Sequence, residues 1–129
     1  MESVLKIGVV IPRSGPAGIW APSCEASAVL AAAEINTAGG MLGRPIELIM
    51  CDAGSSDLSA ATAAATAVDL EGVEAVVAMV TSSARGPVRQ AIRPGIPFVY
   101  TPQFEGAEQH PEIMTIGETA AELLGPGID

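Results

Sequence analysis

The sequence VLKIGVVI at residues 4–11 is the strongest indication of the fold. It is a nearly continuous apolar run that Pro12 and Arg13 bring to an end. A strand covered by helices on both faces of a sheet buries both sets of its alternating side chains. The run therefore predicts a buried strand of a parallel sheet. Because no basic region precedes a longer apolar one, we expect a strand here and not a signal peptide, so an exported form would already have lost its signal.

The rest of the chain alternates between apolar strand patterns and helical patterns. Further strands are predicted at residues 45–51, 74–79, 97–101 and 112–116. Helices are predicted at 22–38, 58–70 and 118–124, and a further helix that the serines at 82 and 83 can cap runs to about residue 93. Such alternation is typical of an α/β fold with a doubly wound, mainly parallel sheet. We expect about five strands with helices on both faces. The charge at Glu47 suggests that the second strand lies at or near an edge of the sheet.

The first predicted helix carries a stripe of apolar positions. Pro22 fits a first helical turn, and Gly39 and Gly40 provide the stop. One apolar stripe of the kind that faces a core consists of Ala26, Val29, Leu30, Ala33 and Thr37.

Length and composition fit one domain with one core. The chain has 129 residues, of which 49% are hydrophobic and only 3% aromatic, so the core must consist of Ala, Val, Ile, Leu and Met. The formal charge of −9 disfavours nucleic-acid binding. We find no apolar run long enough to span a membrane. Cys24 and Cys51 allow one disulfide at most, and with His110 as the single histidine we expect no metal and no cofactor.

The usual catalytic signatures of α/β folds are missing. The first loop has Gly15 and Gly18 without the GxGxxG spacing, and neither a phosphate-binding P-loop nor a GxSxG elbow occurs. Asp52, at the end of the second predicted strand, is the one match to a nucleotide site. Ser82 could pair with His110, but a serine before a helix is more typical of a cap. We therefore predict that the chain is not an enzyme.

Candidate binding residues gather where the predicted strands end. Right-handed crossovers bring the carboxyl ends of parallel strands to one edge of the sheet. Ser82 and Ser83 precede a helix whose free N–H groups suit a carboxylate or an amide oxygen, although helix capping alone would explain the same serines.

A second group of candidates comes from two loops at that edge. The loop YTPQFE at residues 100–105 and the lone tryptophan in the first loop together predict ligand contacts. The candidate residues of this group are Trp20, Tyr100, Thr101, Gln103 and Phe104.

Four segments carry a resemblance to a known family. They are KIGVV at residues 6–10, SGP at 14–16, AAEINTAGG at 32–40 and LGRPIE at 42–47. These segments resemble the amino-terminal, Rossmann-like lobe of type I periplasmic binding proteins, in the branch that binds leucine, isoleucine, valine, amides or urea. The segment YTPQFEG at residues 100–106 is similar to the amide-binding members in particular.

The resemblance implies a two-lobed clamp that closes on a small amino acid, amide or urea. Such a protein is the periplasmic substrate-binding component of an ABC importer and works with a permease. The alternative is a cytoplasmic amide-type sensor that regulates gene expression through a protein partner. Residues 1–117 would form the amino-terminal lobe, and residues 118–129 would begin the crossover into a second lobe. With the cleft wall exposed, we also expect a possible homodimer of the isolated lobe.

The resemblance also implies roles for individual residues. Ser82 matches the family's serine that contacts the carboxylate or amide of the ligand. Tyr100 and residues 101–104 match the second ligand-contacting loop. Trp20 matches the aromatic lip that follows the SGP turn.

Overall fold

The computed structural model describes residues 3–127, and a parallel sheet of five strands forms its centre. The strands lie in the order β2-β1-β3-β4-β5, and every neighbouring pair is parallel. Their bounds are β1 Leu5–Ile11, β2 Ile46–Asp52, β3 Ala75–Ala78, β4 Phe98–Tyr100 and β5 Ile113–Thr115. The predicted α/β fold is confirmed, and β2 occupies an edge as its sequence suggested.

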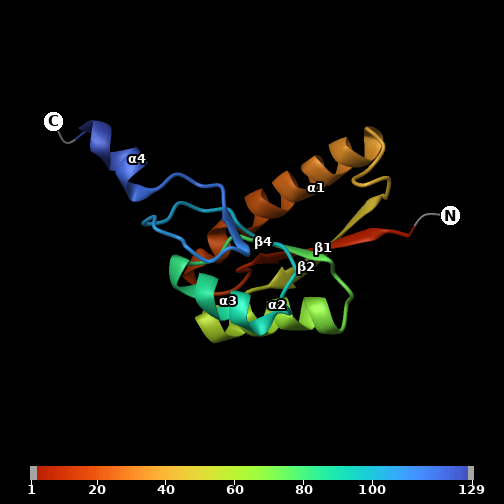
Figure 1. Ribbon diagram of the computed structural model, residues 1–129, viewed down its shortest axis with the longest axis horizontal. Coiled ribbons are helices and arrows are strands. Elements are labelled where there is room, and N and C mark those ends of the chain that lie inside the picture. The colour runs from red at the N-terminus through yellow and green to blue at the C-terminus, as the bar shows by residue number, and fades with distance from the viewer. Residues whose placement is uncertain (1–2, 128–129) are drawn as a thin grey trace.

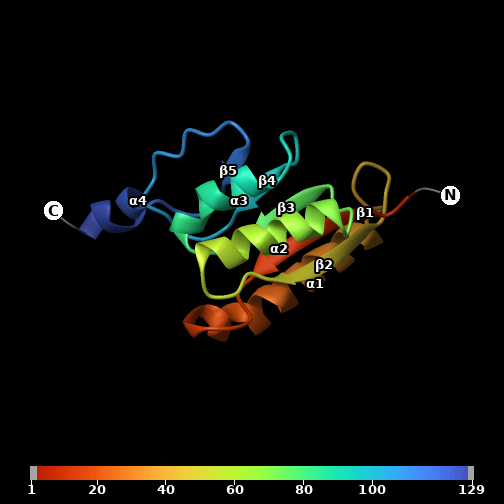
Figure 2. The same ribbon diagram turned by 90° about the horizontal axis from the view of Figure 1, so that it is seen from below.

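Helices cover both faces of this sheet (Figure 1). Helix α1 lies on one face, and α2 and α3 lie on the other, as Figure 2 shows from a second side. The helices are α1 Ala21–Thr37, α2 Asp57–Asp69, α3 Arg85–Ala91 and the short α4 Ala120–Leu124, with 3-10 turns at Pro16–Trp20, Ser82–Ala84 and Gly125–Gly127. None of the helices in residues 3–127 is long and apolar enough to cross a membrane.

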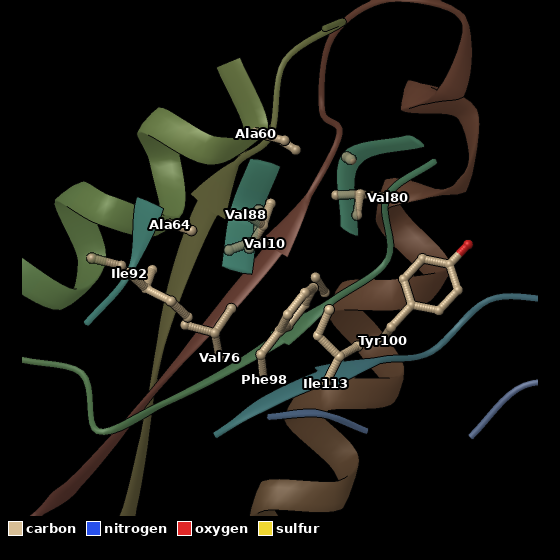
Figure 3. Close-up of a cluster of buried hydrophobic side chains, with 14 of the residues drawn as sticks. Val10, Ala60, Ala64, Val76, Val80, Val88, Ile92, Phe98, Tyr100 and Ile113 are labelled. Atoms are coloured by element: carbon tan, nitrogen blue, oxygen red, sulfur yellow. The ribbon is translucent and has the colours of Figure 1, made fainter. Parts of the chain in front are cut away.

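The main core fills the space between the sheet and the pair α2 and α3 (Figure 3). Phe98, Val76 and Val10 point into it from the strands and are at most 1% exposed. The expectation of a core without aromatic residues was therefore wrong. Helix α2 contributes small side chains, so its backbone can lie close to the sheet. Its N-terminus is fixed by Ser56, whose side chain accepts a hydrogen bond from the Ser59 amide in a capping box.

On the other face of the sheet lies α1, and the apolar stripe predicted to be its buried side was wrong. Val29 and Leu30 are 56% and 61% exposed, and Ala26 and Ala33 are exposed as well. The side that turns toward the sheet carries Ala21, Cys24, Ala28, Ala32 and Ile35. In a helix made mostly of alanine, every face is moderately apolar. Periodicity therefore did not identify the buried side.

The two cysteines are free thiols on opposite faces of the sheet. Cys24 packs against the small cluster under α1, whereas Cys51 packs against the main core. Burial raises the pKa of the Cys51 thiol above its usual value.

The ends of the strands are aligned along one edge. Ile11 is paired with Asp52, Ala78 with Tyr100, and Tyr100 with Thr115. Two glycines let the loops beyond this edge approach one another. At Gly15, with φ of 76°, an added Cβ would lie 2.8 Å from the Cβ of Ser55. At Gly117 it would lie 2.0 Å from the carbonyl oxygen of Pro102, so the chain after β5 is pressed against the loop after β4.

Candidate binding cleft

A cleft of about 530 Å³ opens at the carboxyl edge of the sheet. The loops after β1, β2, β3 and β4 all contribute to it, as expected for a parallel α/β sheet. Its lining residues include Trp20, Asp57, Thr81, Ser82, Tyr100 and Gln103. Its size is typical of a site for a small molecule.

Three of the predicted residues line this cleft from two loops. Trp20 ends the first 3-10 turn and is 59% exposed, so its indole forms part of the rim. Tyr100 is only 1% exposed, and its hydroxyl donates to the carbonyl oxygen of Gln103 at 3.1 Å. Figure 3 shows this hydroxyl pointing away from the other labelled side chains. Burial raises the pKa of Tyr100, so the phenol stays protonated at neutral pH.

Ser82 also lines the cleft, and a carboxylate fixes its hydroxyl. Its Oγ donates to Oε1 of Glu105 at 2.6 Å. Arg85 Nη2 donates to the same oxygen at 2.7 Å. This hydrogen bond from Ser82 is the main cause that lowers the pKa of Glu105 below its usual value. Glu105 therefore stays ionised at neutral pH.

Arg85 is the buried centre of this group. It is 9% exposed, and its Cζ lies 5.3 Å from the Tyr100 ring centroid and 4.8 Å from that of Phe104. Its Nη1 lies 3.0 Å from Oε1 of Glu108, within ion-pair range but without hydrogen-bond geometry. Arg85 thus connects the start of α3 to the loop that follows β4.

Neither Ser82 nor Ser83 caps a helix, so the capping interpretation was wrong. Thr81 precedes the 3-10 turn without a side-chain cap, and Ala84 precedes α3. Ser83 does not line the cleft and donates to Oδ1 of Asp57 at 2.9 Å. Both serine hydroxyls donate to carboxylates that lie far away in the sequence, Glu105 and Asp57. No local sequence pattern reveals such contacts.

Thr101 and Phe104 do not line the cleft. The Thr101 hydroxyl donates to the carbonyl oxygen of Ala78 at 3.1 Å and so joins β4 to β3. Phe104 belongs to the main core and packs edge-to-face on Tyr100, with ring centroids 6.0 Å apart. In this structure both residues support the wall of the cleft.

Asp52 is occupied by the loops beside it. Its Oδ1 accepts hydrogen bonds from the amides of Arg13 at 2.9 Å and Gly54 at 2.8 Å, and Oδ2 lies 3.4 Å from the Ser14 hydroxyl. The Arg13 amide, followed by the Gly54 amide, lowers the pKa of this carboxyl. Asp52, the one match to a nucleotide site, instead fixes the conformation of the first loop.

The sequence pattern did not reveal two charged residues at this site. Asp57 lines the cleft, and Arg85 lies behind its wall. Over residues 3–127, no three His, Cys, Asp or Glu side chains converge as metal ligands. The cleft offers a ligand hydrogen-bonding groups, apolar surface, one indole and the carboxylate of Asp57.

An α/β sheet with a cleft at its carboxyl edge is the arrangement in which parallel α/β folds usually bind small molecules. Residues 4–129 match the family model described as periplasmic binding protein. The chain belongs to this family, whose members bind solutes and are not enzymes.

Solved structures agree with this assignment. The chain is similar to the branched-chain amino acid transporter substrate-binding protein LivJ from Streptococcus pneumoniae in complex with isoleucine, at 27% identity and a TM-score of 0.72, covering 91% of this chain and 34% of that one. A leucine-, isoleucine-, valine-, threonine- and alanine-binding protein from Brucella ovis shares the fold, with 22% identity, a TM-score of 0.75, and coverage of 93% of this chain and 34% of that one. The chain thus spans about a third of the length of these relatives. A comparison with curated protein sequences finds no match.

Proposed function

We propose that the chain binds a small polar solute in this cleft and is the amino-terminal ligand-binding lobe of an ABC importer's substrate-binding component. The observation that carries the proposal is the cleft itself, into which the loops after four strands bring Trp20, Ser82, Tyr100 and Gln103. In this proposal residues 1–117 form the lobe, and residues 118–129 lead toward a second lobe. The partner is a permease, and the compartment is the periplasm.

The solute is proposed to be an amino acid, an amide or urea. Similarity to the isoleucine complex of LivJ favours an amino acid. The segment YTPQFEG at residues 100–106, which supplies Tyr100 and Gln103 to the wall, favours an amide. This same segment also supports the second candidate function, a cytoplasmic amide-type sensor acting through a protein partner. The homodimer expected from the sequence stays a prediction.

Trp20 provides a direct way to test the proposal. It is the only tryptophan of the chain and lies at the rim of the cleft, so its fluorescence reports on that site alone. We expect the emission to change on titration with at least one of leucine, isoleucine, valine, acetamide or urea. Calorimetry should give a matching dissociation constant.

Ser82→Ala tests whether the ligand occupies the proposed wall. Loss of one hydrogen bond to a polar or charged group is expected to weaken binding by about 1–3 kcal/mol, roughly 5- to 150-fold. Ser27→Ala is the matched control, because the Ser27 hydroxyl lies on α1 and donates to the carbonyl oxygen of Ser23. Equal affinities for the Ser82→Ala protein and the native chain would contradict the proposed site.

A further inference from the structure

One carboxylate lines the cleft, and no cation among the described residues pairs with it. Asp57 is the only acidic or basic side chain among the described residues that line the cleft. Within residues 3–127 it forms no ion pair. A charge that is partly removed from water costs free energy unless an opposite charge lies nearby. A cationic group of a ligand would supply the missing partner.

The contacts of Asp57 use only one of its two carboxylate oxygens. Oδ1 accepts from the Ser83 hydroxyl at 2.9 Å and lies 3.4 Å from the Thr81 hydroxyl. Among the described residues, no hydrogen bond reaches Oδ2. Asp57 also stands in the first turn of α2, where the free N–H groups of the helix favour a negative charge. Support of the turn and of the helix therefore accounts for Oδ1 and leaves Oδ2 available to a ligand.

Two arginines lie in the loops around the cleft, and carboxylates engage both of them. Arg85 forms ion pairs with Glu105 at 2.7 Å and with Glu108 at 3.0 Å. Arg13 forms an ion pair with Glu25 on α1. The Glu105 side chain is 66% exposed, so it adds negative charge near the same edge of the sheet. The potential in the cleft is therefore negative and favours a cation.

Two further features of the cleft fit a solute that carries both charges. Within residues 3–127 the peptide N–H groups of Ser82 and Ser83 have no hydrogen-bond partner, so they stay available to a carboxylate or an amide oxygen. At the rim, Trp20 is 59% exposed, and the face of an indole attracts organic cations. One molecule can thus place an oxygen at the turn after β3 and a separate cationic group beside Asp57.

We propose that Asp57 is a cation subsite, which selects a solute with a protonated amino or guanidinium group beyond the group held at the turn after β3. The solute class is a cationic amino acid, unlike the isoleucine in the LivJ complex. The inference rests on the proposed function and deepens it, because it names the kind of amino acid. Asp57 acts here through the charge of Oδ2, in addition to its structural contacts through Oδ1.

Arginine and citrulline are a matched pair of probes. They have the same heavy-atom framework, but the guanidinium of arginine is charged and the ureido group of citrulline is neutral. Calorimetry and Trp20 fluorescence on the full chain, at constant ionic strength, should show arginine binding at least about 5-fold more tightly than citrulline, a difference of about 1 kcal/mol. Lysine and norleucine extend the comparison to an ammonium group, and we expect the preference in at least one pair.

Asp57→Asn separates the charge from the structural contacts. Asparagine keeps an oxygen that can accept from the Ser83 hydroxyl, but it has no negative charge. The preference for the cationic probe should fall by about 5-fold, while the neutral probe binds as before. A residue that only supported the turn would weaken both probes equally. An unchanged ratio of the two affinities in Asp57→Asn would therefore overturn the inference.

Glu47→Gln is the control for net charge, because a chain with a formal charge of −9 attracts cations in general. Glu47 is exposed near the amino end of β2 and does not line the cleft. Its replacement should leave the preference unchanged. The inference is overturned if Glu47→Gln lowers the preference as much as Asp57→Asn does, or if the native chain shows no preference in either pair.

Failure of the proposed function would look different. If none of leucine, isoleucine, valine, acetamide, urea, arginine and lysine binds, the proposed function fails, and the inference fails with it. If a neutral solute such as leucine or acetamide binds, while neither cationic probe binds more tightly than its neutral counterpart, the proposed function stands and the inference is overturned.

Discussion

Helices α1 and α2 cover opposite faces of the same sheet, yet they are attached to it in different ways. Helix α2 buries five residues, whereas α1 buries only Ala21. The N-terminus of α2 is capped by Ser56, and α1 begins after Trp20 without a side-chain cap. One face of the sheet is therefore stabilised mainly by apolar burial.

Beneath α1 the apolar cluster is smaller, and polar contacts add to it. The Asn36 side chain donates to the carbonyl of Ile46 at 2.9 Å and accepts from the Ile46 amide at 2.7 Å, joining the helix to the edge strand β2. At the other end, Arg13 forms an ion pair with Glu25 on α1. Two similar alanine-rich helices should therefore respond to different perturbations, since α2 depends mainly on packing and α1 depends more on hydrogen bonds and charge.

The largest expected effect is on the packed face. Phe98→Ala removes a ring that is 1% exposed in the core under α2 and α3, and it should lower the free energy of unfolding by about 3–5 kcal/mol. Leu30→Ala, on the exposed side of α1, should change it by less than about 0.5 kcal/mol. Urea denaturation followed by circular dichroism measures both. A large loss for Leu30→Ala would show that the outer side of α1 is buried in solution.

The difference between α1 and α2 also explains which parts of the fold could be predicted from the sequence. Residues 4–11 and the alternation of elements were enough for the parallel sheet, because burial on both faces of a strand leaves a continuous apolar pattern. The face of α1 was not predictable. Val29 and Leu30 are the largest apolar residues near its centre, so the prediction placed the buried stripe on their side of the helix. The structure leaves that side exposed.

The candidate site shows a similar limit. Strand ends predict which loops meet, and Trp20, Ser82, Tyr100 and Gln103 do line one cleft. The direction of each side chain within a loop depends on partners far along the chain. Arg85 meets Glu105 across 20 residues of sequence, and no periodicity or capping rule records such a pair. Their role in binding stays a prediction.

An effect of intermediate size is expected from the same substitution made on each of the two helices. Ala64 on α2 is 0% exposed, whereas Ala33 on α1 is exposed. Ala64→Leu forces three extra carbons into a closely packed contact and should cost about 1–3 kcal/mol. Ala33→Leu adds the same atoms in solvent and should be neutral within about 0.5 kcal/mol. Thermal denaturation of both proteins checks this, and equal destabilisation by the two substitutions would contradict the difference in packing.

The smallest expected effect concerns acid, and it should separate the two helices. Hydrogen bonds from the Arg13 and Gly54 amides lower the pKa of Asp52 in the folded chain, and the hydrogen bond from Arg13 lowers that of Glu25. A depressed folded pKa adds stability above the unfolded value of about 4, and this stability is lost as the pH falls through the folded pKa.

Between about pH 5 and pH 2, hydrogen-exchange protection of the first loop and of α1 should therefore decline before that of α2, whose buried residues are all apolar. Asp52→Asn keeps an oxygen that can accept the two amide hydrogen bonds but cannot titrate there, so the acid-dependent loss in the first loop should become smaller. Protection factors from NMR, corrected for intrinsic exchange, provide the measurement. If α1 and α2 lose protection together in both proteins, the polar contacts of the first loop do not control α1, and the two faces unfold as one unit.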